Sequence, residues 1–273
     1  MVTLKKYHGL GNDYLIYDPN QNRELLQERQ IQLLCRRNTG VGADGILSGP
    51  VLENEKIKVR IFNPDGSDNG IRIFSKYLKD AGYVKEKCYE LWTKAGPVQV
   101  EFLDEDASRM KVDMGYAAFG ADSIHAVGFE GDMINESVFF CDNFYNITCV
   151  SMGNPHAVVF VDSTADLPLE QIGPHFEHHE RFPRRTNTEF VEIVSPEYVK
   201  MRVWERGTGE TLACGTGCCA TAVACVLNGK TGRKVTVEVL GGALTIQWDE
   251  KTNHIFMTGP AEFVFDGELE YEV

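Results

Sequence analysis

The chain has 273 residues, with 27 Lys and Arg against 40 Asp and Glu, and a formal net charge of −13. This length fits one large domain or two of ordinary size, and it is enough to bury a sizeable core. Hydrophobic residues make up 43% and charged residues 25%, which is usual for globular proteins and argues against a disordered chain. The acidic balance argues against binding to nucleic acid or to an anionic membrane.

The N-terminal residues 1–8 lack the apolar core of a signal peptide, and no stretch approaches the roughly 18 apolar residues of a spanning helix. We therefore expect a cytoplasmic protein whose eight cysteines are reduced thiols. Cys214 and Cys218 are close in sequence, but no second pair at the spacing of a zinc site accompanies them, so we expect no metal.

Two segments of helix length, residues 69–82 and 215–229, each begin in a loop that contains glycine and end at a glycine. The first places Ile73, Tyr77 and Leu78 on one face, as an amphipathic helix does. The second is small and apolar almost all round, which predicts a buried helix.

Each of these helices is followed by one of two similar segments. Residues 92–119 follow the first helix and residues 238–265 follow the second. In each, a glycine opens an alternating strand, an acidic turn follows, and a second strand ends near a Met and a Gly. Alternation of this kind predicts half-buried strands joined as hairpins. Gly96 of the first segment corresponds to Gly242 of the second, 146 residues later, so the chain repeats itself once.

One repeat with this long a period predicts a duplicated α+β fold with two pseudo-symmetric lobes. We expect each lobe to be a mostly antiparallel sheet or open barrel around a long central helix. Residues 1–119 should form the first lobe and 120–262 the second, with the strand-like segment 263–273 returning to the first. A site between two lobes is typical for small molecules, and a helix N-terminus from each lobe would attract a carboxylate.

Five loops combine glycine, which lets a backbone approach a ligand, with asparagine, which both donates and accepts hydrogen bonds. One such loop would mark only a turn, whereas five of them in a duplicated fold indicate a binding site. They are residues 8–13, 40–45, 63–70, 152–156 and 205–217.

Cys214 is the thiol with the clearest functional context, because it lies at the predicted start of a helix, where the helix dipole lowers a thiol pKa. Cys218, Cys219 and Cys225 lie within the same helix, and we interpret them as small buried residues.

Three other polar groups have both a functional and a structural interpretation. His156 follows an Asn-Pro turn and is a candidate proton partner for a thiolate, although a single histidine is more often structural. Glu205 and Arg206 precede a glycine-rich run, which favours recognition of an amino acid over a surface ion pair. The charged stretch at residues 175–185 is interpreted as a solvated face and not as a metal site.

Together these segments resemble the diaminopimelate epimerase family over nearly the whole chain. The resemblance implies a cofactor-independent isomerase that interconverts LL- and meso-diaminopimelate in lysine and cell-wall precursor biosynthesis. It implies a small-molecule substrate, and it leaves a homodimer open. The segments are YHGLGNDYLIYD, CRRNTGVGADGIL, RIFNPDGSDNGIRIFSKYL, MGNPHAVVFV, NTEFVEI and RVWERGTGETLACGTG.

In this family two cysteines, one per lobe, act on opposite faces of the α-carbon, and Cys214 matches the second of them. Two further matches assist the thiols, namely His156 and Glu205. The remaining matches are substrate contacts: Asn69, Gly70, Gly215 and Thr216 for the α-carboxylate, Asn63, Asn154, Asn187 and Arg206 for the distal amino-acid end, and Asn12 for a further contact.

The resemblance fails at one loop, where the family pattern DGSEAEMCGNGxRC contains the first catalytic cysteine. Here Ser67 and Asp68 lead directly to Asn69 and Gly70, so several positions and that cysteine are missing, and Ile73 replaces the later cysteine. Three explanations are open. The stretch is absent only from this written sequence, or the loop is truly shorter with Ser67 or Asp68 near the base position, or the chain binds an amino acid without catalysis.

Beside the epimerase, two other functions therefore stay open. One is a racemase of another amino acid on the same fold, and the other is a catalytically impaired homologue that binds an amino acid.

Overall fold

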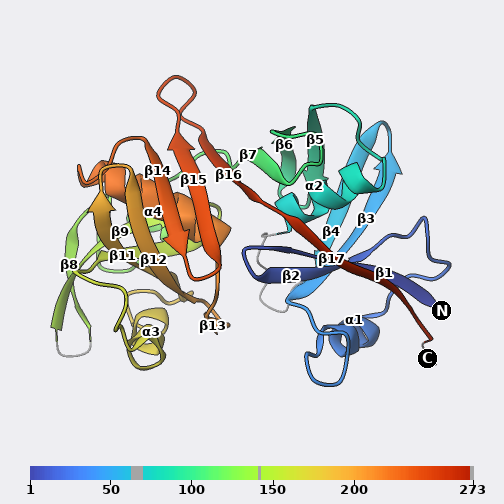
Figure 1. Cartoon of the computed structure of the whole chain (residues 1–273). Coiled ribbons are helices and arrows are strands. Elements are labelled where there is room, and N and C mark those ends of the chain that lie inside the picture. The colour runs from blue at the N-terminus through green and yellow to red at the C-terminus, as the bar shows by residue number, and fades with distance from the viewer. Residues whose placement is uncertain (63–69, 141–142, 271–273) are drawn as a thin grey trace. The chain divides into compact units, whose positions relative to one another are not determined.

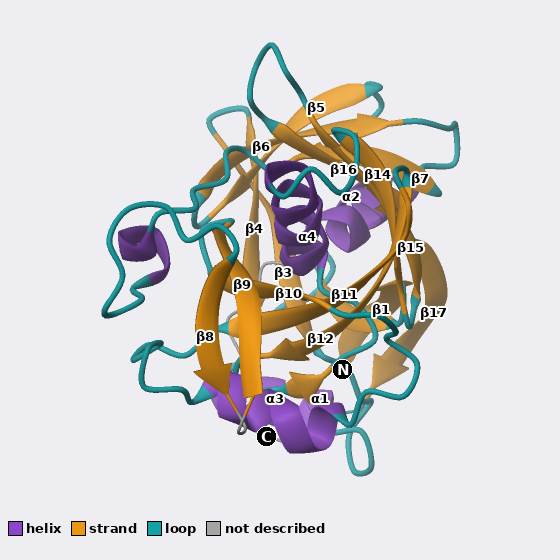
Figure 2. Ribbon diagram, turned by 90° about the vertical axis from the view of Figure 1, so that its left-hand side faces the viewer, coloured by secondary structure: helices purple, strands orange, loops and turns teal. Residues whose placement is uncertain are grey.

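The computed structural model describes residues 1–62, 70–140 and 143–270. Figures 1 and 2 show its strands and helices. The structure is rich in strands, most neighbouring strands are antiparallel, and the helices are few. The predicted two-lobed α+β fold is therefore confirmed.

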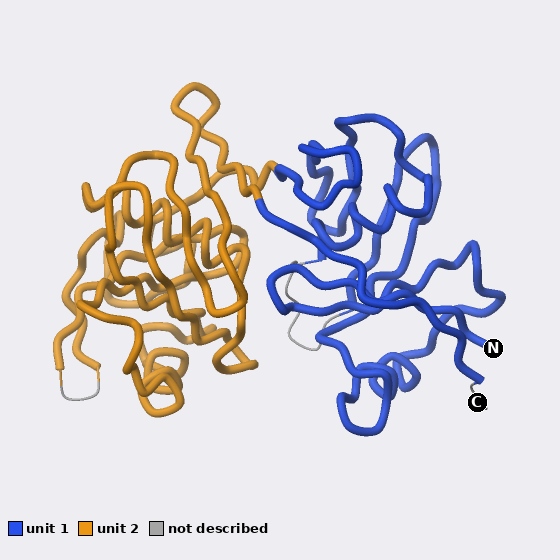
Figure 3. Tube along the Cα trace, in the orientation of Figure 1, with its two compact units in different colours: residues 1–112, 259–273 blue, residues 113–258 orange. Residues whose placement is uncertain are grey.

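The chain forms two compact units, residues 1–112 with 259–273 and residues 113–258 (Figure 3). The lobes expected from the sequence, 1–119 and 120–262, differ from these bounds by a few residues.

Backbone hydrogen bonds account for the bounds of the units. The Met114 N–H donates to the Ile255 carbonyl at 2.8 Å, and the Ile255 N–H donates to the Gly115 carbonyl at 2.8 Å. The Ala261 N–H donates to the Ser108 carbonyl at 3.1 Å. The first two bonds hold residues 114–115 in the second unit, and the third holds residue 261 in the first.

The first unit contains antiparallel pairs joined by two parallel ones, β2 with β3 and β4 with β5. Its last strand pairs antiparallel with its first, from Val2 opposite Leu269 onward. Its elements are β1 (Val2–Gly9), β2 (Asn12–Tyr17), α1 (Glu28–Cys35), β3 (Gly45–Glu53), β4 (Lys56–Phe62), α2 (Ile71–Asp80), β5 (Cys88–Thr93), β6 (Gly96–Phe102), β7 (Arg109–Asp113) and β17 (Glu262–Leu269).

Helix α2 is the buried helix of the first unit and contacts β1, β2 and β17. Ile73, Tyr77 and Leu78 are buried, which confirms the predicted apolar face. The hydroxyl of Tyr77 donates to the carboxylate of Asp18 at 2.5 Å, and that of Tyr83 donates to the same carboxylate at 2.7 Å. These bonds satisfy a carboxylate that is only 3% exposed, and they fix α2 next to the end of β2.

The second unit has the same mixture of pairings, with parallel neighbours at β10 with β11 and β12 with β14. The hairpin strands predicted in both halves are present. Its elements are η1 (Ala121–Ile124), β8 (Glu136–Phe140), β9 (Asn143–Ser151), β10 (Pro155–Phe160), α3 (Leu169–Glu177), β11 (Asn187–Ser195), β12 (Tyr198–Glu205), β13 (Gly209–Glu210), α4 (Gly215–Leu227), β14 (Lys234–Val239), β15 (Gly242–Trp248) and β16 (Ile255–Pro260).

Helix α4 is the central helix of the second unit and contacts β9, β10, β11, β12, β14 and β15 (Figure 2). It contains no charged residue, and its small side chains are buried nearly all round. The predicted buried helix is confirmed, because small apolar residues let surrounding strands approach it from every side.

The interpretation of residues 175–185 as a solvated face is wrong in part. Phe176, Glu177 and Phe182 are buried. The ring of Phe176 stacks on that of Phe140 with centroids 4.2 Å apart. The charges hid this pattern, because the buried residues lie at the end of α3 and in the turn after it, where the spacing of apolar positions is irregular.

None of the helices in the described ranges has the length and apolar character to cross a membrane.

Candidate active site

Cys214 is the N-cap residue of α4, as predicted, and is only 1% exposed. Gly215 and Thr216 form the first turn of that helix. The sulfur lies 3.6 Å from the hydroxyl oxygen of Thr216 and accepts a hydrogen bond from the N–H of Gly217. The thiol, Gly215 and Thr216 are therefore at one helix N-terminus, where free N–H groups favour a carboxylate ligand.

The predicted lowering of the Cys214 pKa is wrong. Burial raises the pKa of this thiol well above its ordinary value, and the carboxylates of Glu205 and Glu189 raise it further. The hydrogen bonds from Thr216 and Gly217 oppose this shift without cancelling it. A buried anion beside two carboxylates is less stable than a neutral thiol. The neutral thiol is therefore the favoured form of Cys214.

The ionisation of Cys214 gives a testable pH dependence. Because the protonated form is favoured, its thiolate should form only above the ordinary thiol value of 9.0. We expect the thiolate absorbance of the native protein, minus that of Cys214→Ala, to stay near zero at neutral pH and to rise only in alkali. A difference signal that titrates at or below neutral pH would contradict this assignment.

A chain of polar contacts connects His156 to Cys214. His156 is the second residue of β10, and its Nδ1 lies 2.6 Å from Oε1 of Glu189, with both side chains fully buried. Its Nε2 lies 3.0 Å from Oδ1 of Asn154. The Asn154 amide donates to the Thr216 hydroxyl at 3.3 Å, and Thr216 contacts the sulfur. His156 is therefore connected to Cys214 through Asn154 and Thr216, and among the described residues no direct hydrogen bond joins the two.

Glu189 is a site residue that the sequence interpretation missed. It lies on β11 two positions after Asn187, so both side chains are on the same face of the strand. A Cβ built on Gly217 would lie 2.7 Å from its Oε1, so this carboxylate lies against the start of α4. Its Oε2 is buried and has no hydrogen-bond partner among the described residues. The period of two from Asn187 in NTEFVEI was the signal that could have found it.

Asn187 and Arg206, which the resemblance assigns to the same end of the substrate, lie next to each other in the structure. Oδ1 of Asn187 accepts a bond of 2.9 Å from the backbone N–H of Arg206, and its Nδ2 donates to the carbonyl of Pro155 at 2.9 Å. Asn187 therefore joins the start of β10 to the turn after β12. The half-buried Arg206 donates to the carbonyl of Arg184 at 3.4 Å. A direct contact of either side chain with substrate stays a prediction.

Glu205 lies at the end of β12 and is 6% exposed. Its Oε1 accepts a hydrogen bond of 2.5 Å from the hydroxyl of Thr211. Of the charged groups that raise the pKa of Cys214, Glu205 has the larger effect. Its predicted role beside the thiol is therefore electrostatic in the free protein.

In the first unit, Asn12 opens β2 and its Nδ2 donates to Oδ2 of Asp44 at 3.0 Å. The Asp44 carboxylate also accepts a bond of 3.0 Å from the Asp13 N–H and one of 2.5 Å from Arg37. A carboxylate can only accept, so the amide orientation of Asn12 is fixed. Its Oδ1 is buried and has no partner within the described ranges, which suits a donor such as a substrate ammonium group.

Gly70 is the N-cap residue of α2. A Cβ at this position would lie 2.3 Å from a methyl carbon of Leu47, so a larger residue at this helix start would require the Leu47 side chain to move. Asn63 and Asn69 lie outside the described residues, as do Ser67 and Asp68.

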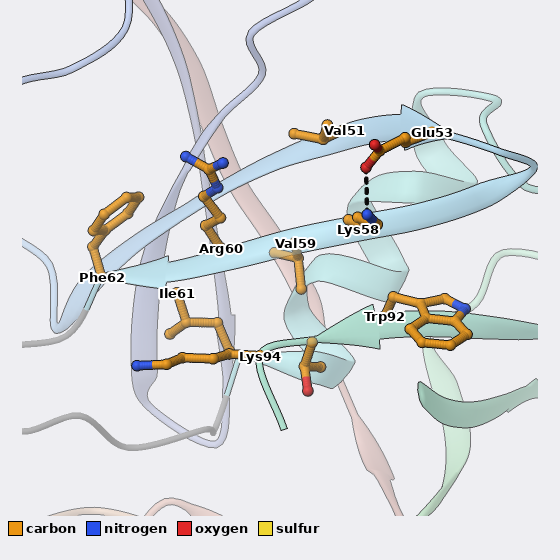
Figure 4. Close-up of a pocket in the computed structure, with 10 residues that line it drawn as sticks. Val51, Glu53, Lys58, Val59, Arg60, Ile61, Phe62, Trp92 and Lys94 are labelled. Atoms are coloured by element: carbon orange, nitrogen blue, oxygen red, sulfur yellow. Dashed lines mark hydrogen bonds and ion pairs between the residues drawn. The ribbon is translucent and has the colours of Figure 1, made fainter. Parts of the chain in front are cut away.

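A cavity of about 730 Å³ lies beside β4 and β5 of the first unit (Figure 4). Lys58, Arg60 and Lys94 make its lining basic, and Lys58 pairs with Glu53. None of the site residues that the structure describes lines this cavity. Across the described ranges no group of three or more His, Cys, Asp or Glu could hold a metal ion. The seven described cysteines are free thiols.

Comparison with known families fits the two halves of the chain. The model of a family described as diaminopimelate epimerase matches residues 4–120 and 148–264. The chain belongs to the diaminopimelate epimerase family. The two matched segments are equally long and begin 144 residues apart, which agrees with the internal repeat.

Named members of this family are similar to the chain along its whole length. Diaminopimelate epimerase of Methanococcus maripaludis is 44% identical over 276 residues, covering 98% of this chain and 100% of the relative. That of Synechococcus elongatus is 47% identical over 279 residues, covering 98% of each. These alignments run over more positions than the 273 residues of this chain, so each relative has residues where this chain has none.

Solved structures with the same fold are more distant. A probable proline racemase from Agrobacterium radiobacter has a TM-score of 0.69 at 13% identity, covering 100% of this chain and 94% of that one. A predicted epimerase from Pseudomonas aeruginosa has a TM-score of 0.69 at 14% identity, covering 100% of both. At this identity the likeness shows the fold and leaves the substrate to other evidence.

Proposed function

We propose that this chain is a cofactor-independent epimerase that interconverts LL- and meso-diaminopimelate, with Cys214 as the acid–base group on one face of the α-carbon. Family membership supports the reaction. The observation that carries the assignment of Cys214 is a buried thiol at the N-cap of the central helix. We place the enzyme in lysine and cell-wall precursor biosynthesis, in the cytoplasm.

The neutral form of Cys214 favours one of its two proposed roles, that of proton donor. Cys214 would donate its proton to the carbanion when the α-proton leaves from the opposite face. In the reverse reaction it would need to act as thiolate. N–H groups of Gly215 and Thr216 would stabilise the negative charge that develops at the carboxylate. Asn69 and Gly70 are proposed to do so from the first unit.

Other matched residues are proposed to select the substrate. A diaminopimelate molecule has a second amino-acid end, and its recognition needs several donors and acceptors. Asn12 would accept from an ammonium group, and His156 and Glu205 would tune the thiol. The proposed contacts to the distal end are Asn63, Asn154, Asn187 and Arg206.

Inversion needs a second base on the opposite face of the α-carbon. No cysteine occurs between Cys35 and Cys88, so the family's first thiol has no counterpart in this sequence. A Ser67 hydroxyl is a far poorer base than a thiolate at neutral pH, and the Asp68 carboxylate is weakly basic. With Cys214 as the sole acid–base group, a proton would return to the face that it left. The missing thiol thus favours a second candidate function, one-base proton exchange without inversion.

Incubation of each diaminopimelate isomer in D2O tests both functions. A two-base epimerase converts the LL-isomer to the meso-isomer with deuterium at the inverted carbon. A one-base enzyme deuterates the α-carbon of one isomer and leaves its configuration unchanged. Chiral chromatography with mass spectrometry measures both quantities.

Three outcomes of this experiment separate the alternatives. If the intact natural protein causes neither inversion nor deuterium incorporation, both functions are excluded. Binding of diaminopimelate in a calorimeter without exchange would then identify an amino-acid-binding homologue. Turnover of another amino acid in a substrate panel would identify a racemase.

A further inference from the structure

The turn that carries Arg206 joins the paired strands β12 and β13 and is closed by a hydrogen bond of 3.1 Å from the Thr208 N–H to the Glu205 carbonyl. Its glycines Gly207 and Gly209 have φ of +81° and +93°, a conformation that side chains rarely adopt. No atom lies within 4 Å of a Cβ built on Gly207. The backbone of the turn is therefore open at Gly207 to groups from other elements.

Glu177, the last residue of α3, supplies such a group. Its Oε1 accepts a bond of 2.9 Å from the N–H of Gly207, and its Oε2 accepts one of 2.8 Å from the indole N–H of Trp204. Arg185 lies 3.4 Å from the same Oε1. Both carboxylate oxygens thus hold the segment on either side of Arg206.

Packing of α3 against Trp204 is equally close. A Cβ built on Gly173 would lie 2.3 Å from the indole ring, so the helix backbone rests directly on that side chain. Trp204 is 8% exposed. Helix α3 therefore fixes the last residues of β12 through both the ring and the carboxylate.

The position of Glu177 is unfavourable unless its hydrogen bonds compensate. It is 4% exposed, and a carboxylate at a helix C-terminus faces the negative end of the helix dipole. Burial of an unpaired carboxylate is costly. The N–H groups of Gly207 and Trp204 and the guanidinium of Arg185 offset that cost. The first two belong to the segment that contains Arg206.

We propose that Glu177 is a positioning residue that holds Arg206 in place to bind the distal end of the substrate. This inference rests on the proposed function of Arg206. The hydrogen bonds of Glu177 go to Gly207 and Trp204 and not to Cys214, so it acts on substrate affinity and not on proton transfer.

The variant Glu177→Gln tests the proposal. The two carboxylate oxygens of Glu177 face different donors, so glutamine in the same position would place its NH2 group, a donor, against the N–H of either Gly207 or Trp204. We expect KM for diaminopimelate to rise about tenfold with kcat within about twofold of the native value, the effect of losing one hydrogen bond to a charged group. Glu170→Gln is the matched control, because Glu170 lies on the same helix and is exposed, and its KM should not change.

A double-variant cycle separates positioning from general loss of structure. If Glu177 acts through Arg206, Glu177→Gln adds no further rise in KM when Arg206 is already Ala. An equal factor in both backgrounds, an unchanged KM in the single variant, or a fall of kcat alone would each overturn the proposal.

A readout without substrate keeps this test distinct from that of the proposed function. Hydrogen exchange of the Gly207 amide should be faster in Glu177→Gln than in the native protein and unchanged in Glu170→Gln. Unchanged exchange in Glu177→Gln would contradict the proposal even if the native protein does not act on diaminopimelate. Faster exchange with no turnover by the native protein would leave the bracing of the turn supported and refute the proposed function.

Discussion

Replacement of Cys214 by alanine should abolish inversion of diaminopimelate and the proton exchange on its own face of the α-carbon. General acid–base groups contribute roughly 10²- to 10⁴-fold to rate, and here one thiol provides the whole acid–base function on its face of the α-carbon. We expect a loss of about 10³-fold or more in the rate of deuterium incorporation, measured by mass spectrometry in D2O. Binding of substrate should be largely kept, because the helix N–H groups remain.

Cys225→Ala is the matched control for this experiment. Cys225 is a buried thiol of the same helix, and burial raises its pKa to about 12, but it lies near the other end of α4 from Cys214. Its removal should leave exchange at the native rate. Turnover that survives in Cys214→Ala would show that another group performs the proton transfer.

Replacement of Glu189 by alanine should have the largest effect on stability. The variant removes one partner of a fully buried pair and leaves His156 without its contact at 2.6 Å. Breaking a buried pair in this way costs about 3–5 kcal/mol of unfolding free energy. Denaturant unfolding followed by circular dichroism measures that quantity.

Glu189→Gln is the contrasting variant, because it keeps an oxygen that accepts from His156 and removes the charge. We expect a smaller loss of stability than for alanine. The pKa of Cys214 should fall toward its ordinary value, since one of the two carboxylates that raise it is gone. A Cys214 titration that does not move between the native protein and Glu189→Gln would rule out this electrostatic role.

Local patterns in the sequence predicted the elements that position the site. The alternation around Gly96 and Gly242 predicted hairpin strands, and the small apolar run after Cys214 predicted a buried helix with this thiol at its start. Such features depend on periods of two or 3.6 residues and on glycine, so they can be found without knowledge of distant contacts.

Contacts between distant residues explain what the sequence did not reveal. Glu189 is 25 residues before Cys214, and Glu177 is 30 residues before Gly207. Both were hidden because a glutamate in a strand or a charged stretch is most often exposed. Only the folded chain shows that they are buried and which donors they face.

The sequence by itself determined the duplicated fold, the family and the location of one thiol at a helix N-terminus, because each follows from local spacing and motif. The protonation state of that thiol was decided only by the tertiary structure. A helix N-terminus lowers a thiol pKa, but burial and the carboxylates of Glu205 and Glu189 outweigh it here. Desolvation and through-space charge depend on neighbours brought together by folding, so the chemistry of Cys214 follows from the fold and not from its motif.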